Sequence, residues 1–362
     1  MKYIIKGGEK LTGEIKISGS KNSVLACMAA ALLTEDEITL ENVPEISDVE
    51  VFILICKSLG VYVKRDGDRL KIQAKEIKSS KLPDELVKSL RASVLLAGPV
   101  LHRLGKVSFV FPGGDVIGKR SIKVHLDGFS SLGVNLSQDD LYFHLEYLQS
   151  QASKEDCSIF LEEASNTALE NIILSSVCGK RTVTIKNCPQ EPQITDLCQI
   201  LNSMGAKIQG IGSKTLIIKG VLKLHGASFR VGDDYIEVAT YAIAAAITGG
   251  KIKILCQDLD LEPISVILEN FGISFSKEND GYIVESKKIV GVEKVVTNIW
   301  PGFPTDLMSA VIVLASQATG KTLCHDWMYE SRMFFVDKLI GMGAEMIIAD
   351  PHRVVVYGPS RL

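Results

Sequence analysis

The chain has 362 residues, which is more than a single hydrophobic core usually encloses, so we expect two domains. It is 46% hydrophobic and 23% charged with a formal net charge of −3, as in a globular protein with no general attraction to nucleic acid or an anionic membrane. Its longest apolar stretches, such as 92–101, are too short to span a bilayer, and the first residues contain too short an apolar run for a signal peptide.

Eight cysteines are scattered along the chain without a Cys-x-x-Cys pair. Such a set is typical of a reduced, cytoplasmic protein and has no metal-ligand spacing. We therefore expect no metal, no other cofactor and a cytoplasmic location.

The chain repeats one pattern five times. An apolar residue followed by glycine ends a helical pattern at positions spaced 73, 72, 67 and 71 residues apart, namely Gly60, Gly133, Gly205, Gly272 and Gly343. Each repeat begins with a helix rich in small and apolar residues, and these helices are expected at 23–33, 91–101, 168–177, 238–247 and 306–318. A strand, a second amphipathic helix ending at the glycine, and two further strands follow, as in 180–186, 196–204, 206–209 and 215–219.

Because the first helices are apolar nearly all round, we expect them in the interior with the sheets outside. Only 19 residues follow Gly343, enough for strands at 345–348 and 353–357 but not for a sixth helix pair. The first strands, expected at 3–6 and 14–18, could complete the last repeat by pairing across the chain.

A glycine-rich loop carries the first candidate for chemistry. In Phe111-Pro-Gly-Gly-Asp-Val-Ile-Gly-Lys-Arg120, glycines leave the backbone bare beside Asp115, with Lys119 and Arg120 following. An acid beside such an anion site is a candidate proton donor, and a solvated surface turn is the alternative. The stretch 113–119 also approaches a phosphate-binding P-loop, but Arg120 stands where Ser or Thr should hold magnesium.

Six motifs together resemble one family along essentially the whole chain. They are Ser18-Gly-Ser-Lys-Asn22, Leu86-Val-Lys-Ser-Leu-Arg91, the 112–120 loop, Glu191-Pro-Gln-Ile-Thr-Asp196, Pro301-Gly-Phe-Pro-Thr-Asp306 and Tyr329-Glu-Ser-Arg332. In order and spacing the chain resembles the UDP-N-acetylglucosamine 1-carboxyvinyltransferases, which are enolpyruvyl transferases.

The resemblance implies an α/β fold of two inside-out, barrel-like domains with three repeats each, so this chain looks like the family without its sixth repeat. It implies a first domain at 22–230, a second domain made of 1–21 and 231–362, and hinges near Lys21 and 230–231. The implied reaction transfers the enolpyruvyl group of phosphoenolpyruvate to the 3-hydroxyl of UDP-N-acetylglucosamine in peptidoglycan precursor synthesis. We expect a monomer that binds these two small molecules, without nucleic acid or membrane.

The resemblance also implies roles for individual residues. Asp115 stands where most members carry cysteine and would be the general acid, insensitive to epoxide alkylation, while Asp306 would be the base. Lys21 would be catalytic and bind phosphoenolpyruvate with Asn22. The remaining substrate contacts would be Arg91, Arg120, Ser121, Ile122, Lys123, Val124, Met328 and Arg332. Each has a structural alternative: Lys21, Asn22 and Asp306 suit helix starts, and Arg91 suits a solvated helix face.

Two stretches on the nucleotide side depart from the family pattern, Ser121-Ile-Lys123 and Ser165-Asn-Thr-Ala-Leu169. The expected loss of the last repeat would also remove two arginines. Besides the enzyme, two hypotheses therefore stay open: a degenerate homologue that binds a nucleotide sugar without efficient turnover, and a P-loop ATPase.

Overall fold

The structure is a computed structural model that describes residue 4 and residues 7–118, 120–147, 156–257 and 259–362. Its contacts divide the chain into two compact units. The larger unit contains Gly19–Asp115 and Arg120–Gly232, and the smaller unit contains Met1–Ser18, Val116–Lys119 and Asp233–Leu362. The assignment of the loop tip, Val116–Lys119, to the smaller unit was not expected from the sequence. That 22–230 is a domain that folds by itself stays a prediction.

The larger unit holds the first three repeats. Its helices are α1 (Lys21–Ala30), η1 (Ala31–Leu33), α2 (Ser47–Ser58), α3 (Asp84–Ser89), η2 (Arg91–Leu96), α4 (Ala97–Leu104), α5 (Lys123–Ser131), α6 (Asn166–Ser176) and α7 (Pro192–Ser203). Its strands are β2 (Ile38–Glu41), β3 (Tyr62–Asp66), β4 (Arg69–Gln73), β5 (Lys106–Val110), β6 (Val134–Gln138), β7 (Tyr142–Tyr147), β8 (Cys157–Phe160), β9 (Thr182–Lys186), β10 (Lys207–Gln209), β11 (Thr215–Lys219) and β12 (Ala227–Arg230).

The smaller unit holds the other two repeats. Its helices are α8 (Tyr235–Ile247), α9 (Glu262–Asn270), η3 (Thr305–Leu307), α10 (Met308–Gln317), η4 (Arg332–Phe335) and α11 (Val336–Gly341). Its strands are β1 (Thr12–Lys16), β13 (Lys251–Leu255), β14 (Ile273–Glu278), β15 (Gly281–Ser286), β16 (Lys294–Val296), β17 (Gly320–His325), β18 (Glu345–Asp350) and β19 (Arg353–Gly358).

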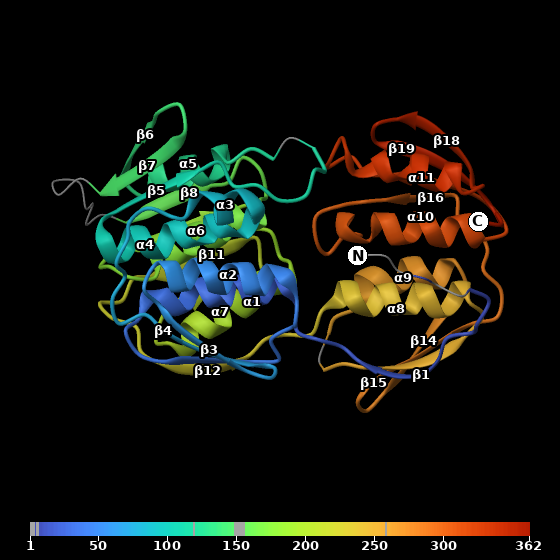
Figure 1. The fold of residues 1–362 in the computed structure, drawn as a ribbon, viewed down its shortest axis with the longest axis horizontal. Helices are drawn as coiled ribbons and strands as arrows, with labels where there is room; N and C mark the ends of the chain where they lie inside the picture. Colours follow the sequence, from blue (N-terminus) through green and yellow to red (C-terminus); the bar gives the residue numbers. More distant parts are fainter. Residues whose placement is uncertain (1–3, 5–6, 119, 148–155, 258) are drawn as a thin grey trace. The chain divides into compact units, whose positions relative to one another are not determined.

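The described strands form five small open sheets, one for each repeat. Their orders are β12-β2-β4-β3, β5-β7-β6 and β10-β11-β9-β8 in the larger unit, and β1-β13-β15-β14 and β16-β17-β19-β18 in the smaller one. Each contains three antiparallel strands, and four of them add one parallel edge strand. In the sheet of the second repeat, a single parallel bridge between Lys81 and Ser108 takes the place of the parallel edge strand. In each unit of Figure 1 the helices lie between the sheets. The expected architecture of inner helices and outer sheets is confirmed, although no sheet formed by the described strands closes into a barrel by itself.

The partner expected for the N-terminal strands was wrong. β1 pairs in parallel with β13 of the fourth repeat, with Thr12 opposite Lys251, and not with the last repeat. The parallel edge of the last sheet is taken by β16, which pairs with β17. Of the strand expected at 3–6, Tyr3, Ile5 and Lys6 lie outside the described residues, and Ile4 is not in a strand.

The helix ends follow the sequence signal closely. Gly60, Gly133, Gly205, Gly272 and Gly343 all have positive φ, at 89°, 79°, 97°, 92° and 108°. A residue without a Cβ adopts this left-handed conformation without steric penalty, so each glycine ends its helix and turns the chain into the next strand.

The inner helices form the core of each unit. Every residue of 23–30 in α1 and of 168–176 in α6 is buried. The single helix expected at 91–101 is instead a 3₁₀ segment, η2, followed by α4. Asn171 of α6 accounts for the change, because its side chain accepts from Gly98 N at 3.2 Å and donates to Val94 O at 2.9 Å. No helix of the described residues is both long and apolar enough to cross a membrane.

Candidate active site

Lys21 and Asn22 form the first turn of α1. Ser20 caps this helix by accepting from Ser23 N at 3.4 Å, and Ser20 N donates to Gly232 O at 2.8 Å. The Lys21 ammonium lies 3.7 Å from Asp48, and both residues are half-buried. A lysine beside a helix N-terminus suits an anionic group such as phosphate.

Arg91 is nearly buried, with 9% of its surface exposed. Its guanidinium donates to the carbonyl oxygens of Pro112 at 3.3 Å, Arg120 at 2.8 Å and Ser121 at 3.0 Å. These carbonyls belong to residues at the two ends of the glycine-rich loop, so Arg91 holds the two ends of the loop together. The solvated position suggested by sequence pattern alone was wrong, and the loop-holding contacts were not foreseen.

The glycines of the loop pack against the protein's own backbone. A Cβ at Gly113 would overlap the carbonyl oxygen of Lys88, and Gly113 N donates to Val87 O at 3.1 Å. Gly114 has φ +115° and lies against Arg91. The bare backbone therefore lets the loop sit directly on α3 and η2, and Asp115, the next residue, is exposed. Lys119 lies outside the described residues.

The residues after the loop start α5. Ser121 Oγ accepts from Lys123 N at 3.0 Å, and Ile122 is buried in the core. The Lys123 ammonium bonds Asp127 at 2.7 Å and Glu162 at 3.2 Å, which raises its pKa. Val124 and Arg120 are half-buried. Among these expected nucleotide-side residues, Lys123 already has two carboxylate partners and Ile122 faces inward.

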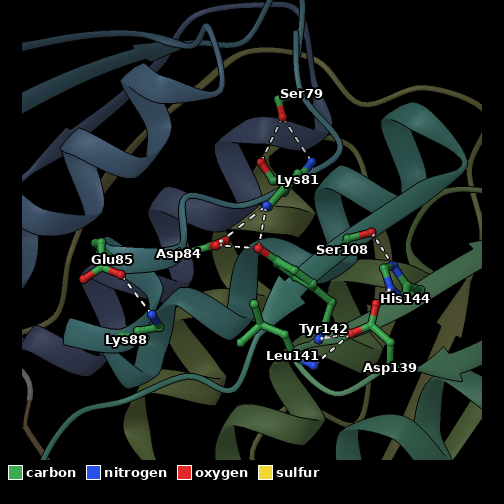
Figure 2. Close-up of polar contacts among 10 residues, drawn as sticks. All are labelled: Ser79, Lys81, Asp84, Glu85, Lys88, Ser108, Asp139, Leu141, Tyr142 and His144. Atoms are coloured by element: carbon green, nitrogen blue, oxygen red, sulfur yellow. Dashed lines mark hydrogen bonds and ion pairs between the residues drawn. The ribbon is translucent and has the colours of Figure 1, made fainter.

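The network in Figure 2 fixes the segments that carry Arg91 and the loop. Lys81 Nζ bonds the Tyr142 hydroxyl at 2.6 Å, and that hydroxyl bonds Asp84 of α3 at 2.5 Å. On the same sheet Ser108 Oγ lies 2.8 Å from His144 Nδ1, whose Nε2 is 3.0 Å from Asp139. Ser108, His144 and Asp139 contact each other in the order of a catalytic Ser-His-Asp triad. However, the backbone N–H of Ser108 donates to Ser80 O, so this N–H cannot stabilise an oxyanion as a triad serine's would.

Two buried ionisable groups lie on or beside α6. Burial, and next the nearby Glu191, raises the pKa of Glu170 to about 8. Burial lowers the pKa of His125 to about 3. His125 Nδ1 lies 3.0 Å from the Asn171 amide nitrogen and so accepts a hydrogen bond, which leaves Nε2 to donate to Thr167 Oγ1 at 3.1 Å. Both groups are buried and belong to the core of the larger unit.

The smaller unit brings Asp306, Met328 and Arg332 together. Asp306 lies in η3, just before the inner helix α10, and its Oδ1 accepts from Arg332 at 2.9 Å. The guanidinium also lies over the ring of Tyr329, 5.2 Å from its centroid. Asp306 is exposed, and its carboxylate is paired with an arginine.

Sequence reasoning missed Asp326, which contacts Met328, Arg332 and Thr305, the residue before Asp306. Its side chain is fully buried and accepts from the Thr305 hydroxyl and from Met328 N at 2.9 Å. Its Oδ2 lies 4.0 Å from Arg332 Nε. The one available signal was an acid directly after a strand. Among the residues described, no three His, Cys, Asp or Glu side chains are grouped to hold a metal ion.

Comparisons with known proteins agree along nearly the whole chain. The family model "EPSP synthase (3-phosphoshikimate 1-carboxyvinyltransferase)" matches residues 5–359. The UDP-N-acetylglucosamine 1-carboxyvinyltransferase of Treponema denticola is 43% identical over 99% of this chain and 86% of its own length. The protein of that name from Borrelia garinii subsp. bavariensis is 44% identical, also over 99% and 86%.

Solved structures share the fold. The enolpyruvyl transferase NikO from Streptomyces tendae has a TM-score of 0.86 at 23% identity, covering 98% of this chain and 83% of its own. An EPSP synthase from Acinetobacter baumannii has a TM-score of 0.72 at 17% identity, covering 99% and 84%. At these identities the likeness concerns the fold alone.

Proposed function

Because the chain belongs to the UDP-N-acetylglucosamine 1-carboxyvinyltransferases, within the EPSP synthase family, we propose that it transfers the enolpyruvyl group of phosphoenolpyruvate to the 3-hydroxyl of UDP-N-acetylglucosamine. Phosphate is the second product. The observation that carries this proposal is the 43–44% identity over 99% of the chain to proteins of that name. The pairing of Asp306 with Arg332, two residues of the family motifs, supports it.

The reaction is an addition followed by an elimination. Asp306 takes the proton of the sugar 3-hydroxyl as its oxygen attacks C2 of phosphoenolpyruvate, and Asp115 delivers a proton to C3. The C2–O bond to phosphate then breaks and the departing phosphate takes the proton held by Asp306, while C3 returns a proton to Asp115 and the double bond is restored. Both carboxyl groups return to their starting protonation states.

Cations position the anionic substrates. Lys21, with Asn22, binds phosphoenolpyruvate at the N-terminus of α1 and stabilises the departing phosphate. Arg91 and Arg120 contact the substrates from the loop side, and Met328 and Arg332 line the sugar. Of the segment 121–124, Ser121, Lys123 and Val124 face the nucleotide while the Ile122 side chain is buried in the core. The two carboxylate partners of Lys123 compete with the nucleotide for its ammonium group.

We place this activity in the cytoplasm, at the start of peptidoglycan precursor synthesis and so upstream of cell-wall growth, cell shape and division. The enzyme acts as a monomer on two small molecules. Analytical ultracentrifugation of the purified chain tests whether it is a monomer. A dimer that forms with increasing concentration would contradict this proposal.

Phosphate release tests the function directly. Purified protein given phosphoenolpyruvate and UDP-N-acetylglucosamine should release phosphate, and neither substrate alone should suffice. Asp115→Asn should lower turnover by about 10²-fold or more with substrate binding largely kept. An epoxide alkylator should leave residue 115 unmodified. Nucleotide-sugar binding without phosphate release would favour the binding-protein hypothesis, and magnesium-dependent ATP binding would favour the ATPase.

A further inference from the structure

Asp326 is held rigidly in the interior of the smaller unit. It follows β17, and its backbone N donates to His352 O at 2.8 Å while His352 Nδ1 lies 2.7 Å from its carbonyl oxygen. Its carboxylate has no exposed surface. One oxygen accepts from the Thr305 hydroxyl and the other from Met328 N. Asp326 thus fixes the residue before Asp306 and the start of the turn that carries Arg332.

Two carboxylates flank the Arg332 guanidinium. Asp306 contacts it at 2.9 Å with 43% of its side chain exposed, whereas Asp326 lies 4.0 Å away and is fully buried. Arg332 Nε is itself buried and has no hydrogen-bond partner among the residues that the structure describes. An unpaired buried donor beside a buried carboxylate is attracted to it strongly, because little water screens the interaction.

The two partners differ in what the reaction does to them. If Asp306 is the base, it becomes neutral when it takes the hydroxyl proton, and its attraction for Arg332 then falls. Asp326 takes no part in proton transfer and stays beside the guanidinium. The charge of Asp326 beside Arg332 therefore keeps the arginine in position at the step when Asp306 is neutralised.

We propose that Asp326 is a positioning residue for the base: it anchors Arg332 and Thr305 so that Asp306 keeps its geometry while its charge changes. This inference rests on the proposed function, in which Asp306 is the base. It predicts that the charge of Asp326, and not only its shape, matters for turnover.

Asp326→Asn tests this, because the amide keeps the shape and an acceptor for Met328 N but removes the charge. We expect kcat to fall about 10-fold or more, with KM for the nucleotide sugar changed less than about 3-fold. Asp350→Asn is the matched control, since Asp350 also accepts from the backbone N two residues later, at 2.8 Å, and bonds an arginine, Arg353, at 2.7 Å. It should leave both constants unchanged.

A double-mutant cycle separates positioning from simple stability. If Asp326 acts through Thr305, the kcat losses of Asp326→Asn and Thr305→Val should be less than multiplicative when combined. An unchanged kcat in folded Asp326→Asn, with only a lower melting temperature, would overturn the proposal and leave a purely structural carboxylate.

A readout without turnover separates this proposal from the proposed function. In NMR spectra the Nε–H proton of Arg332 should exchange with water slowly in the parent protein and faster in Asp326→Asn, but not in Asp350→Asn. If the parent protein releases no phosphate, the proposed function fails. The exchange rates still show whether Asp326 anchors Arg332. Equal exchange rates in all three proteins would contradict the proposal that Asp326 anchors Arg332, even if the enzyme is active.

Discussion

The inner helices of the two units follow one sequence pattern but are enclosed to different degrees. In α1 of the larger unit every residue of 23–30 is buried, and the helix contacts α2, α6, α7 and η2. In α8 of the smaller unit Thr240 is exposed, and Ile236, Tyr241, Ala244 and Ile247 are half-buried along one face. The comparison shows that apolar composition alone does not enclose a helix; the number of neighbouring helices does.

A fragment of the larger unit gives the largest test of this difference. Residues 19–232 should fold cooperatively, with one urea transition by circular dichroism, because they contain three complete repeats and the bond from Ser20 N to Gly232 O. The sequence-derived fragment 22–230 lacks that bond and the Ser20 cap, so it should be about 1 kcal/mol less stable. If neither fragment folds, the larger unit does not stabilise itself.

Matched charge insertions compare the two cores residue by residue. Ala29→Asp in α1 buries a charge without a partner and should cost about 4 kcal/mol or more, which is enough to unfold the larger unit. Ala310→Asp in α10 enters a half-buried position and should cost about 1 kcal/mol. Ala→Ser at each position controls for the helix itself. Similar losses in the two aspartate variants, measured by urea unfolding, would refute the difference in enclosure.

The pH dependence of stability should come largely from the larger unit. The pKa of buried Glu170 is raised from its ordinary value of 4.5 to about 8, so the folded state holds this proton more tightly than the unfolded state. Its stabilising contribution is complete below pH 4.5 and is lost as the pH rises through about 8. Between pH 6.5 and 8 the unfolding free energy should therefore fall by about 2 kcal/mol. Below pH 6.5 His125, whose pKa burial lowers from 6.5 to about 3, contributes a slope of the opposite sign. Glu170→Gln should flatten the profile, and an unchanged slope would show that Glu170 titrates normally.

Amide hydrogen exchange should reveal the smallest difference. Amides of α8 and α10 should open with free energies about 1–2 kcal/mol lower than those of α1 and α6, because their half-buried faces lose less on opening. Equal protection in the two units would mean that two repeats enclose their helices as well as three do.

Local patterns in the sequence predicted the elements and the family motifs. The apolar-glycine pairs located five helix ends correctly, because only a residue without a Cβ adopts the left-handed turn at low cost. The strand expected at 215–219 has those limits in the structure. Asp306 and Arg332 were named from their motifs and lie in contact.

Contacts between distant segments were decided only by the tertiary structure. β1 pairs with β13 across more than 200 residues of chain, and no local pattern selects one parallel edge among several similar sheets. Arg91 reaches three loop carbonyls, and the buried carboxylate of Asp326 accepts from the Thr305 hydroxyl, although neither sequence neighbourhood shows its partner. Backbone conformation depends on the nearest few residues, whereas the partners of a buried charge depend on which segments the fold brings against it.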